Sequence, residues 1–423
     1  MASIERTCYP RLKQRLTKTE LQDFYTATLE EKFFVRENAR NEEPQLHLLL
    51  CLKLFQKLNY FPNLEDVPKS LVNHLSSTLK FGKEALPLVT KRTQYKHHQA
   101  VRDYFAVKSY DKTARKIVRT VVYQTAQTMD NPADLINVAI EELIKERYEL
   151  QAFSTLDRLT GKIRRMVNRR LFQNILRRLN SIQISCLETL LEPDQKSYRT
   201  PYNSLKQLPK KATLKHLQEL ISHLEWLKQI GSFEKVLENI PPLKIRHFYG
   251  EAKALDAGEI KDFAVPKRLA LLVCLVYRSQ FKARDALAEM FIKRMAKLHQ
   301  KAKEALEQIQ LRQTEKAQKL ISLFFGVLQK VDLEKSDAEV GKNVKIFLGN
   351  QDIAVLLDEC ETVSAYYSDN FLPLVWQFYR SHRNTLFRLI KSLHFVSASS
   401  DPALLAILDF LQANENKKSE FLE

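Results

Sequence analysis

Apolar residues recur at spacings of three and four along nearly the whole chain, and alternation of apolar with polar residues is scarce. Such spacing puts apolar side chains on one face of an α-helix, whereas a half-buried strand requires alternation. Tight β-hairpins depend on glycine, and the chain has 8 glycines in 423 residues. The sequence therefore predicts an all-α protein.

The order of the helical segments predicts several modules. Residues 46–58 are apolar round most of the helix, which predicts a buried helix at the centre of the first module. No proline lies between Pro266 and Pro373, and residues 287–309 keep the three-and-four spacing, which predicts long helices packed along a seam, with 278–280 as the candidate break. The expected modules are residues 1–125, 130–230 and 240–413, followed by a polar tail at 414–423.

Positive charge is concentrated in the N-terminal half. The formal net charge is +17; residues 1–230 contain 39 Lys and Arg against 25 Asp and Glu, and residues 231–423 contain 28 against 25. A positive field of this kind attracts a polyanion, either nucleic acid or an anionic membrane surface. The longest apolar run, 269–277, is too short for a membrane span, which needs about 20 residues. We expect a cytoplasmic protein.

Residues 132–147 and 154–170 form the clearest pair of predicted helices. Asn131 can cap the first, which begins at Pro132, and Ser154 with Asp157 resembles a capping box at the start of the second. Two amphipathic helices joined by six residues are typical of a helix-turn-helix, whose second helix enters the major groove of DNA.

The second of these helices carries an apolar stripe and, on another face, a basic one. From Arg158 to Leu187 there are eight Lys and Arg residues and no acidic residue. The residues expected to reach base edges are Thr155, Arg158 and Lys162. Those expected to lie near phosphates are Arg164, Arg165, Arg169, Arg170, Arg177 and Arg178. The alternative is a solvated helix face, or one that docks on an acidic partner.

Two further basic clusters are weaker candidates for DNA contact. The first surrounds Tyr95 and consists of Lys91, Arg92, Lys96, His97, His98 and Arg102. The second surrounds Pro209 and consists of Lys206, Lys210, Lys211 and Lys215. Solvated surface explains each of them equally well or better. Metal binding by His97 and His98 is disfavoured, since adjacent helical residues point about 100° apart.

Residues typical of catalysis are missing. No P-loop, H-E-x-x-H or G-x-S-x-G pattern is present, and the five cysteines are scattered without metal-ligand spacing. The nearest carboxylate cluster lacks the strand ends on which nuclease acids usually sit, so surface acids are the better interpretation. Its members are Glu251, Asp256, Glu259 and Asp262. We expect no catalytic residue, metal or cofactor.

Longer stretches of the sequence resemble a known family. They are YPRLKQRLTKTELQDFYTAT (9–28), LFQKLNYFPNLEDVP (54–68), AFSTLDRLTGKIRRMVN (152–168), IPPLKIRHFYGEAKALDAGEIKDFAVPKRLALLVCLVYR (240–278), RDALAEMFIKRM (284–295) and SAYYSDNFLPLVWQFYRSHRNTLFRL (364–389). In order and content they resemble the N-terminal part of the replicative, cointegrate-forming transposases of the bacterial Tn-three family. In the first module the family tends to have more Arg than Gln94, Lys96 and His98 supply.

The resemblance implies that helical modules at the N-terminus bind transposon terminal inverted repeats and that the middle region holds an assembly together. In the family an RNase-H-like domain with three metal-binding acids cuts and joins strands, and no residue here corresponds to those acids. We therefore expect a non-enzymatic, nucleoid-associated protein that binds double-stranded DNA at transposon ends, with a homodimer or an intact transposase as further partners. The alternative is a helical scaffold, or a truncated transposase that binds DNA non-specifically or inhibits an intact one.

Overall fold

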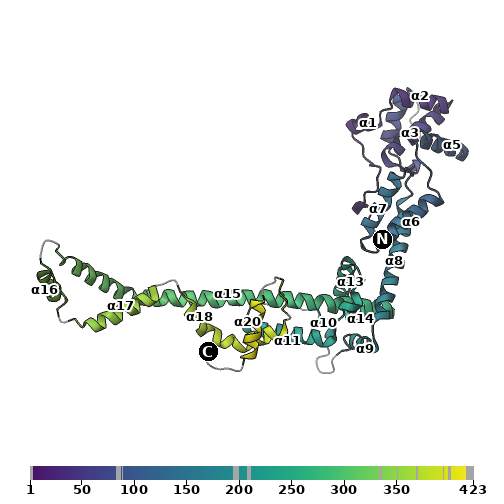
Figure 1. Ribbon diagram of the computed structural model, residues 1–423. Helices are drawn as coiled ribbons and strands as arrows, with labels where there is room; N and C mark the ends of the chain where they lie inside the picture. Colours follow the sequence, from purple (N-terminus) through teal and green to yellow (C-terminus); the bar gives the residue numbers. More distant parts are fainter. Residues whose placement is uncertain are drawn as a thin grey trace. The chain divides into compact units, whose positions relative to one another are not determined.

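The computed structural model describes residues 3–81, 87, 89–193, 200–206, 211–332, 336–349, 351–367, 370–393, 395–398 and 402–415. Every regular element in this part of the chain is a helix, and the only extended pairing within it is an isolated bridge between Lys108 and Tyr148 (Figure 1). The predicted all-α class is confirmed. The chain divides into two compact units, and each is described by itself. They are Met1–Pro201 with Phe233–Leu275, and Tyr202–Ser232 with Val276–Glu423.

The first unit begins with a group of helices around one buried helix. The elements are η1 (Ile4–Arg6), α1 (Lys18–Tyr25), α2 (Leu29–Asn38), α3 (Glu42–Leu58), η2 (Leu64–Asp66), α4 (Lys69–Thr78) and α5 (Lys91–Tyr104). Every residue of α3 from Leu46 to Phe55 is buried, as the apolar circumference predicts. Capping boxes at Thr17 and Thr28 fix the starts of α1 and α2.

Three helices follow and pack on one another. They are α6 (Lys112–Ala126), α7 (Pro132–Lys145) and α8 (Phe153–Arg178). Their shared core contains Val118 and Val122 from α6, Ile136 from α7, and Ile163 and Val167 from α8. We call these three helices the second module. Each contributes one apolar stripe, so none could bury its stripe alone.

Sequence reasoning placed the start of α7 correctly and the start of α8 incorrectly. Helix α7 starts as predicted, with the Asn131 side chain accepting a hydrogen bond from the Ala133 amide and Pro132 in the first turn. The capping box at Ser154 was wrong, because α8 begins at Phe153 and its N-cap, Ala152, makes no side-chain cap. The Phe153 ring, in the first turn of α8, packs edge-on against Tyr9, with ring centroids 5.6 Å apart.

The rest of the first unit consists of shorter helices and the start of a long one. They are α9 (Ser181–Thr189), α12 (Glu234–Leu237), α13 (Pro242–Ala254), α14 (Ala257–Lys261) and the first residues of α15 (Val265–Leu328). Helix α13 lies against α8, where the Phe172 and Phe248 rings are 4.9 Å apart. This contact helps to hold α8 in place against α13.

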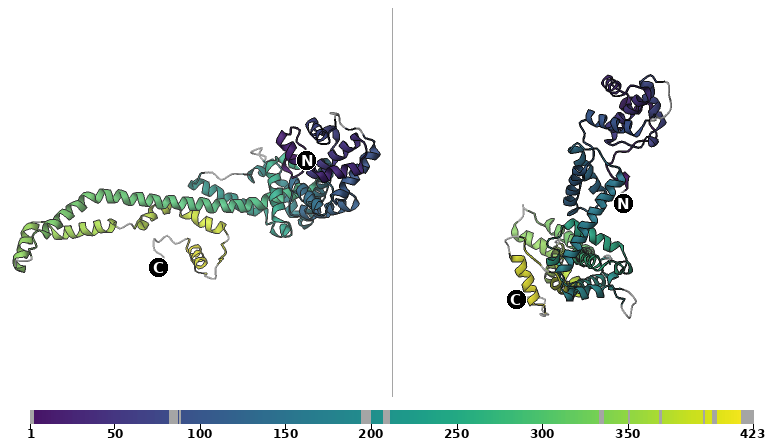
Figure 2. Two further views of the ribbon diagram at one scale, coloured as in Figure 1. Left: turned by 90° about the horizontal axis from the view of Figure 1, so that it is seen from above. Right: turned by 90° about the vertical axis from the view of Figure 1, so that its right-hand side faces the viewer.

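The second unit is built along α15, a continuous helix of 64 residues (Figure 2). Its other helices are α10 (Pro201–Ser204), α11 (Leu214–Ile230), α16 (Asp337–Leu348), α17 (Ile353–Tyr367), α18 (Leu372–Tyr379), η3 (Arg380–His382), α19 (Arg383–Ser392) and α20 (Ala403–Ala413). The expected seam is present, since Leu287, Leu298 and Ala302 are buried. No break occurs at 278–280, because Gln280 Nε2 donates to the carbonyls of Leu227 and Gly231, each at 2.9 Å, and holds the helix against the end of α11.

Candidate nucleic-acid interface

Helix α8 has one face in the core and one in solvent. Leu156, Ile163 and Val167 are at most 5% exposed. The opposite face exposes four cations and no acidic residue, namely Arg158, Lys162, Arg165 and Arg169. None of these four forms an ion pair with another described residue, so their charges are directed outward.

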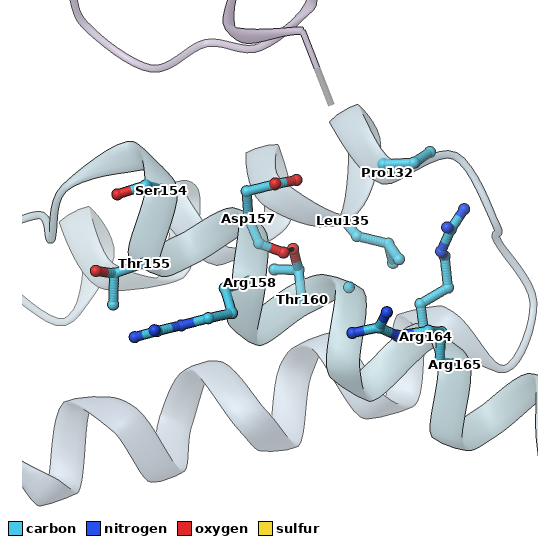
Figure 3. A pocket seen from close by; sticks show the side chains of 10 residues that line it. Pro132, Leu135, Ser154, Thr155, Asp157, Arg158, Thr160, Arg164 and Arg165 are labelled. Atoms are coloured by element: carbon cyan, nitrogen blue, oxygen red, sulfur yellow. Dashed lines mark hydrogen bonds between the residues drawn. The ribbon is translucent and has the colours of Figure 1, made fainter. Parts of the chain in front are cut away.

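A pocket of about 440 Å³ adjoins this face between the starts of α7 and α8 (Figure 3). Its lining includes Ser154, the half-buried Thr155, Arg158 and Arg165. Gly161 also lines it, and a Cβ added there would meet no atom within 4 Å. Packing against the rest of the chain therefore does not require a glycine at this position. A glycine inside a helix nevertheless costs about 1 kcal/mol relative to alanine.

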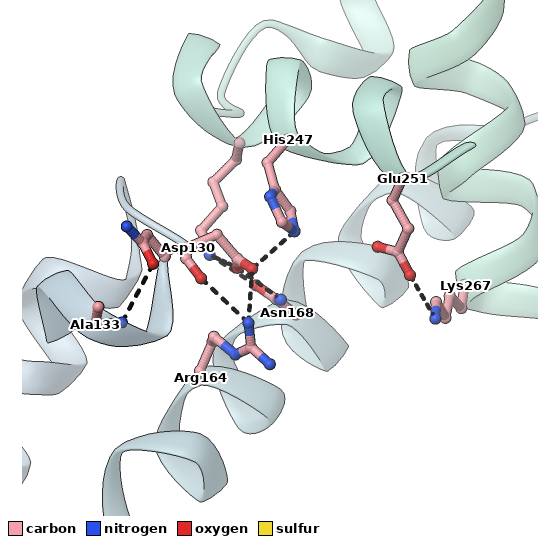
Figure 4. Close-up of polar contacts among 9 residues, drawn as sticks. Asp130, Ala133, Arg164, Asn168, His247, Glu251 and Lys267 are labelled. Carbon is pink, nitrogen blue, oxygen red and sulfur yellow. Dashed lines mark hydrogen bonds and ion pairs between the residues drawn. The ribbon is translucent and has the colours of Figure 1, made fainter. Parts of the chain in front are cut away.

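Behind the pocket, α8 is fastened to α13 by a buried charge cluster. The carboxylate of Asp130 accepts hydrogen bonds from Arg164 Nη1 at 3.3 Å and Asn168 Nδ2 at 2.8 Å, and pairs with His247 Nε2 at 2.8 Å (Figure 4). The fully buried Lys244 ammonium donates to Asp130 and, at 2.8 Å, to Asn168 Oδ1. Arg164 is therefore held by Asp130 and lies beside the exposed stripe rather than in it.

The protonation states of this cluster follow from its contacts. Burial alone would raise the pKa of Asp130, but hydrogen bonds from His247, Lys244 and Asn168, together with the Lys244 charge, outweigh it and lower the pKa to about 2. Burial lowers the pKa of Lys244, and the Asp130 carboxylate opposes this shift. The cluster is a charged anchor that fixes the rotation of α8 about its axis.

The later basic residues of α8 differ in their partners. Arg170 is exposed and donates through Nη1 to the Tyr123 hydroxyl of α6 at 2.8 Å. Arg178 donates to the Val236 carbonyl at 3.2 Å, and Arg177 is exposed. These three arginines lie on other sides of α8 than the exposed stripe, and the fold holds two of them, Arg170 and Arg178.

The basic cluster on α5 is split by the structure. Lys91, Arg92 and Lys96 are exposed. His97 is buried with its Nδ1 2.8 Å from Nδ1 of His47, while Arg102 is buried and donates to Glu149 Oε2 at 3.1 Å. His98 stacks on the Phe61 ring with centroids 3.8 Å apart. His97 and His98 hold the first group of helices together, and Arg102 ties α5 to the segment between α7 and α8.

The third cluster, around Pro209, is divided between half-buried and exposed positions. Lys206 is half-buried with its ammonium 4.4 Å from the Tyr202 ring centroid. Lys211 and Lys215 are exposed, and Lys210 lies outside the described residues. Three of the four acids at 251–262 serve local structure: Asp256 and Glu259 form the capping box of α14, and Glu251 pairs with Lys267 at 2.7 Å.

Sequence reasoning overlooked a row of cations on α6. Lys112, Arg115, Lys116 and Arg119 are all exposed, and α6 contains no acidic residue. The signal was present as basic residues spaced three and four apart with no acid between them. These residues fell within the expected first module, 1–125, and no separate helix was predicted for them.

The described residues contain no group of three or more His, Cys, Asp or Glu that could hold a metal ion. None of the helices they form is long and apolar enough to cross a membrane.

Fold and surface together define an all-helical protein with a cationic helix face built on a three-helix core. Residues 1–163 match a protein family described as a domain of unknown function, DUF4158. The transposase for transposon Tn1546 of Enterococcus faecium is 19% identical over 386 residues, covering 90% of this chain and 39% of that protein. The transposase for transposon Tn501 of Pseudomonas aeruginosa is 24% identical over 242 residues, covering 57% of this chain and 24% of that protein.

A third relative, the transposase for transposon Tn2501 of Escherichia coli, is 20% identical over 370 residues, which is 86% of this chain and 37% of that protein. The chain is related over most of its length to the N-terminal part of Tn-three family transposases. It spans less than half the length of each of these relatives.

Proposed function

We propose that this chain binds the double-stranded terminal inverted repeats of a transposon, as the DNA-recognition part of a Tn-three family transposase. The observation that carries the proposal is the outer face of α8, where Arg158, Lys162, Arg165 and Arg169 are exposed and acidic residues are missing from 158 to 187. An α-helix fits the major groove of B-DNA, and arginine and lysine bind both guanine edges and phosphates there.

The second module supports this use of α8. Helices α6, α7 and α8 pack on one another in a three-helix core, and in this proposal α7 and α8 act as a helix-turn-helix. In this arrangement Thr155, Arg158 and Lys162 reach base edges. The exposed arginines at 165, 169, 170 and 177 contact the DNA backbone. Exposed Lys91, Arg92 and Lys96 on α5, together with Lys211 and Lys215, are further candidates for phosphate contact.

The relatives supply independent support, since they are named as transposases. We do not assign strand cutting to the residues described, because three of the four acids at 251–262 already have structural contacts: Asp256 and Glu259 cap α14, and Glu251 pairs with Lys267. The same proposal includes a cytoplasmic location and association with the nucleoid, because a bacterial protein meets DNA there.

Fluorescence anisotropy tests the proposal on two labelled duplexes, one with the terminal repeat of the element that encodes the chain and one with the same bases shuffled. We expect tighter binding to the repeat, and a fall in affinity of about 10³–10⁵ between 50 and 200 mM salt if six to ten phosphates are contacted. Arg158→Ala should reduce the preference for the repeat by about 1–3 kcal/mol. Equal affinity for both duplexes in the unaltered chain contradicts specific recognition.

Lys145→Ala is the matched control for Arg158→Ala. Lys145 is an exposed cation of the same module, but it lies on α7, where it pairs with Glu142 at 3.3 Å. Removing it takes away the same unit of charge and leaves the α8 face intact. The control should keep the preference for the repeat.

A second candidate function, a helical scaffold, is favoured by apolar side chains left exposed in the second unit. Ile321, Phe324 and Phe325 on α15 are each at least 60% exposed, as are Ile346 on α16 and Leu357 on α17. Exposed apolar surface of this kind marks a site of association. Self-association, binding of an acidic protein and inhibition of an intact transposase are the activities this candidate implies. Sedimentation with and without DNA separates the two, because a scaffold self-associates and shows no shift with DNA.

A further inference from the structure

Helix α6 presents a cationic surface that the proposed function does not use. Lys112, Arg115, Lys116 and Arg119 are exposed, and none of them is ion-paired to another described residue. Lys112 also stands in the first helical turn, where the helix dipole disfavours a positive charge. The four unpaired cations on this helix repel one another, and an anion bound from outside would relieve that repulsion.

This row leads to the basic helix α8. Lys112, Lys116, Arg119 and Tyr123 are spaced by four, three and four residues, which places them along one face of α6. Tyr123 ends that face, and its hydroxyl accepts the hydrogen bond from Arg170 of α8 at 2.8 Å. The Arg170 guanidinium also lies 5.8 Å from the Tyr123 ring centroid. The face of α6 that carries these cations therefore ends at a contact with Arg170 of the basic helix α8.

The third helix of the module has the opposite charge. Helix α7 contains Asp134, Glu141 and Glu142 and a single cation, Lys145, which is paired with Glu142. Positive charge is therefore gathered on α6 and α8 within a module whose remaining helix is acidic. A generally basic protein surface would not separate the signs in this way.

We infer that the α6 row binds the sugar–phosphate backbone of the DNA strand that borders the groove entered by α8. The inference rests on the proposed function, since α8 must be on DNA for α6 to reach the adjoining strand. Contacts of lysine and arginine with phosphate position a protein on the duplex and carry no sequence information. Helix α6 adds affinity for any sequence, while α8 supplies the discrimination.

The test uses Lys116→Gln with Arg119→Gln in the full chain, against Lys145→Gln with Lys253→Gln. The control pair removes two exposed lysines from α7 and α13 in the same unit. Binding is measured by anisotropy to the terminal-repeat duplex and to its shuffled counterpart across a salt series. Circular dichroism confirms that each variant keeps its helix content, as expected for exposed side chains.

Each phosphate contact contributes about 0.9 to the slope of log affinity against log salt. The α6 variant should therefore reduce that slope by roughly two and weaken binding near 0.1 M salt by on the order of fiftyfold, because each lost contact removes about eightfold there. The loss should be equal for both duplexes, which leaves the preference for the repeat unchanged.

Other outcomes are distinguishable. If the α6 variant matches the control while the unaltered chain binds DNA, the inference is wrong and the proposed function stands. A loss confined to the repeat duplex also overturns it, because the row would then read bases. If the unaltered chain binds neither duplex, the proposed function itself fails, and an acidic protein becomes the partner of the basic surface.

Discussion

Helices α5 and α8 are both rich in cations, yet the fold uses them differently. On α5, His97 and Arg102 are buried against His47 and Glu149. On α8, the cations from Arg158 to Arg169 stay exposed, except Arg164, which Asp130 holds at the edge of the stripe. A buried charge is tolerated only with a partner, and an exposed one needs none. A helix therefore exposes an unpaired cationic face only where the fold offers its cations no internal acid.

The largest effect that tests this contrast is acidification. Burial, with the neighbouring His97 and His98, lowers the pKa of His47 from its ordinary 6.5 to about 4, and burial with Arg102 and His97 does the same for His98. The unfolded chain binds these protons first, so stability is complete above pH 6.5 and is lost as pH falls toward 4. The fully buried His47 alone should cost about 3 kcal/mol at pH 4.

The second module should keep its stability as the pH falls from 6.5 to 4. Because the pKa of Asp130 is lowered from 3.8 to about 2, the stability it adds is complete above pH 4 and is lost only as pH falls toward 2. Hydrogen exchange followed peptide by peptide, with rates corrected for pH, should show α3 and α5 opening before α6 to α8. Simultaneous opening, or opening of α8 first, contradicts the contrast.

The next effect is on the stability of single variants. Arg102→Ala leaves Glu149 without its ion-pair partner in a mostly buried site, so the free energy of unfolding should fall by about 3 kcal/mol. Arg92→Ala removes an exposed arginine from the same helix and should change stability by less than about 0.5 kcal/mol. Urea denaturation measures both. Similar effects from the two variants would show that α5 does not divide its cations as described.

The smallest effect separates stability from binding within α8. Gly161→Ala should stabilise the chain by up to about 1 kcal/mol, because alanine favours helix and its Cβ meets no atom within 4 Å. The same methyl group lies where DNA would approach α8, so affinity for DNA should fall. Gly250→Ala on α13 is the control, since its Cβ also meets nothing. Binding that is unchanged in both variants would place DNA away from the pocket.

Periodicity was enough to predict the helices and the buried circumference of α3, because every apolar stripe must find a core. It was also enough to place Arg158 and Arg165 on a different face of α8 from Leu156. It could not show that Arg102 turns inward, since its partner Glu149 is 47 residues away in sequence. The anchor between Asp130 and Lys244 joins residues 114 apart. Contacts of this range depend on tertiary packing, which local spacing does not encode.

The opposite signs of α7 and of the pair α6 and α8 give the second module an electric dipole. Such a dipole acts over roughly a Debye length, which is about 8 Å at physiological ionic strength. Before any contact forms, the field of a polyanion would turn the basic side toward itself and the acidic side away. Productive collisions then make up a larger share of all encounters, so the association rate constant should fall steeply with added salt, while dissociation depends more on the contacts that follow.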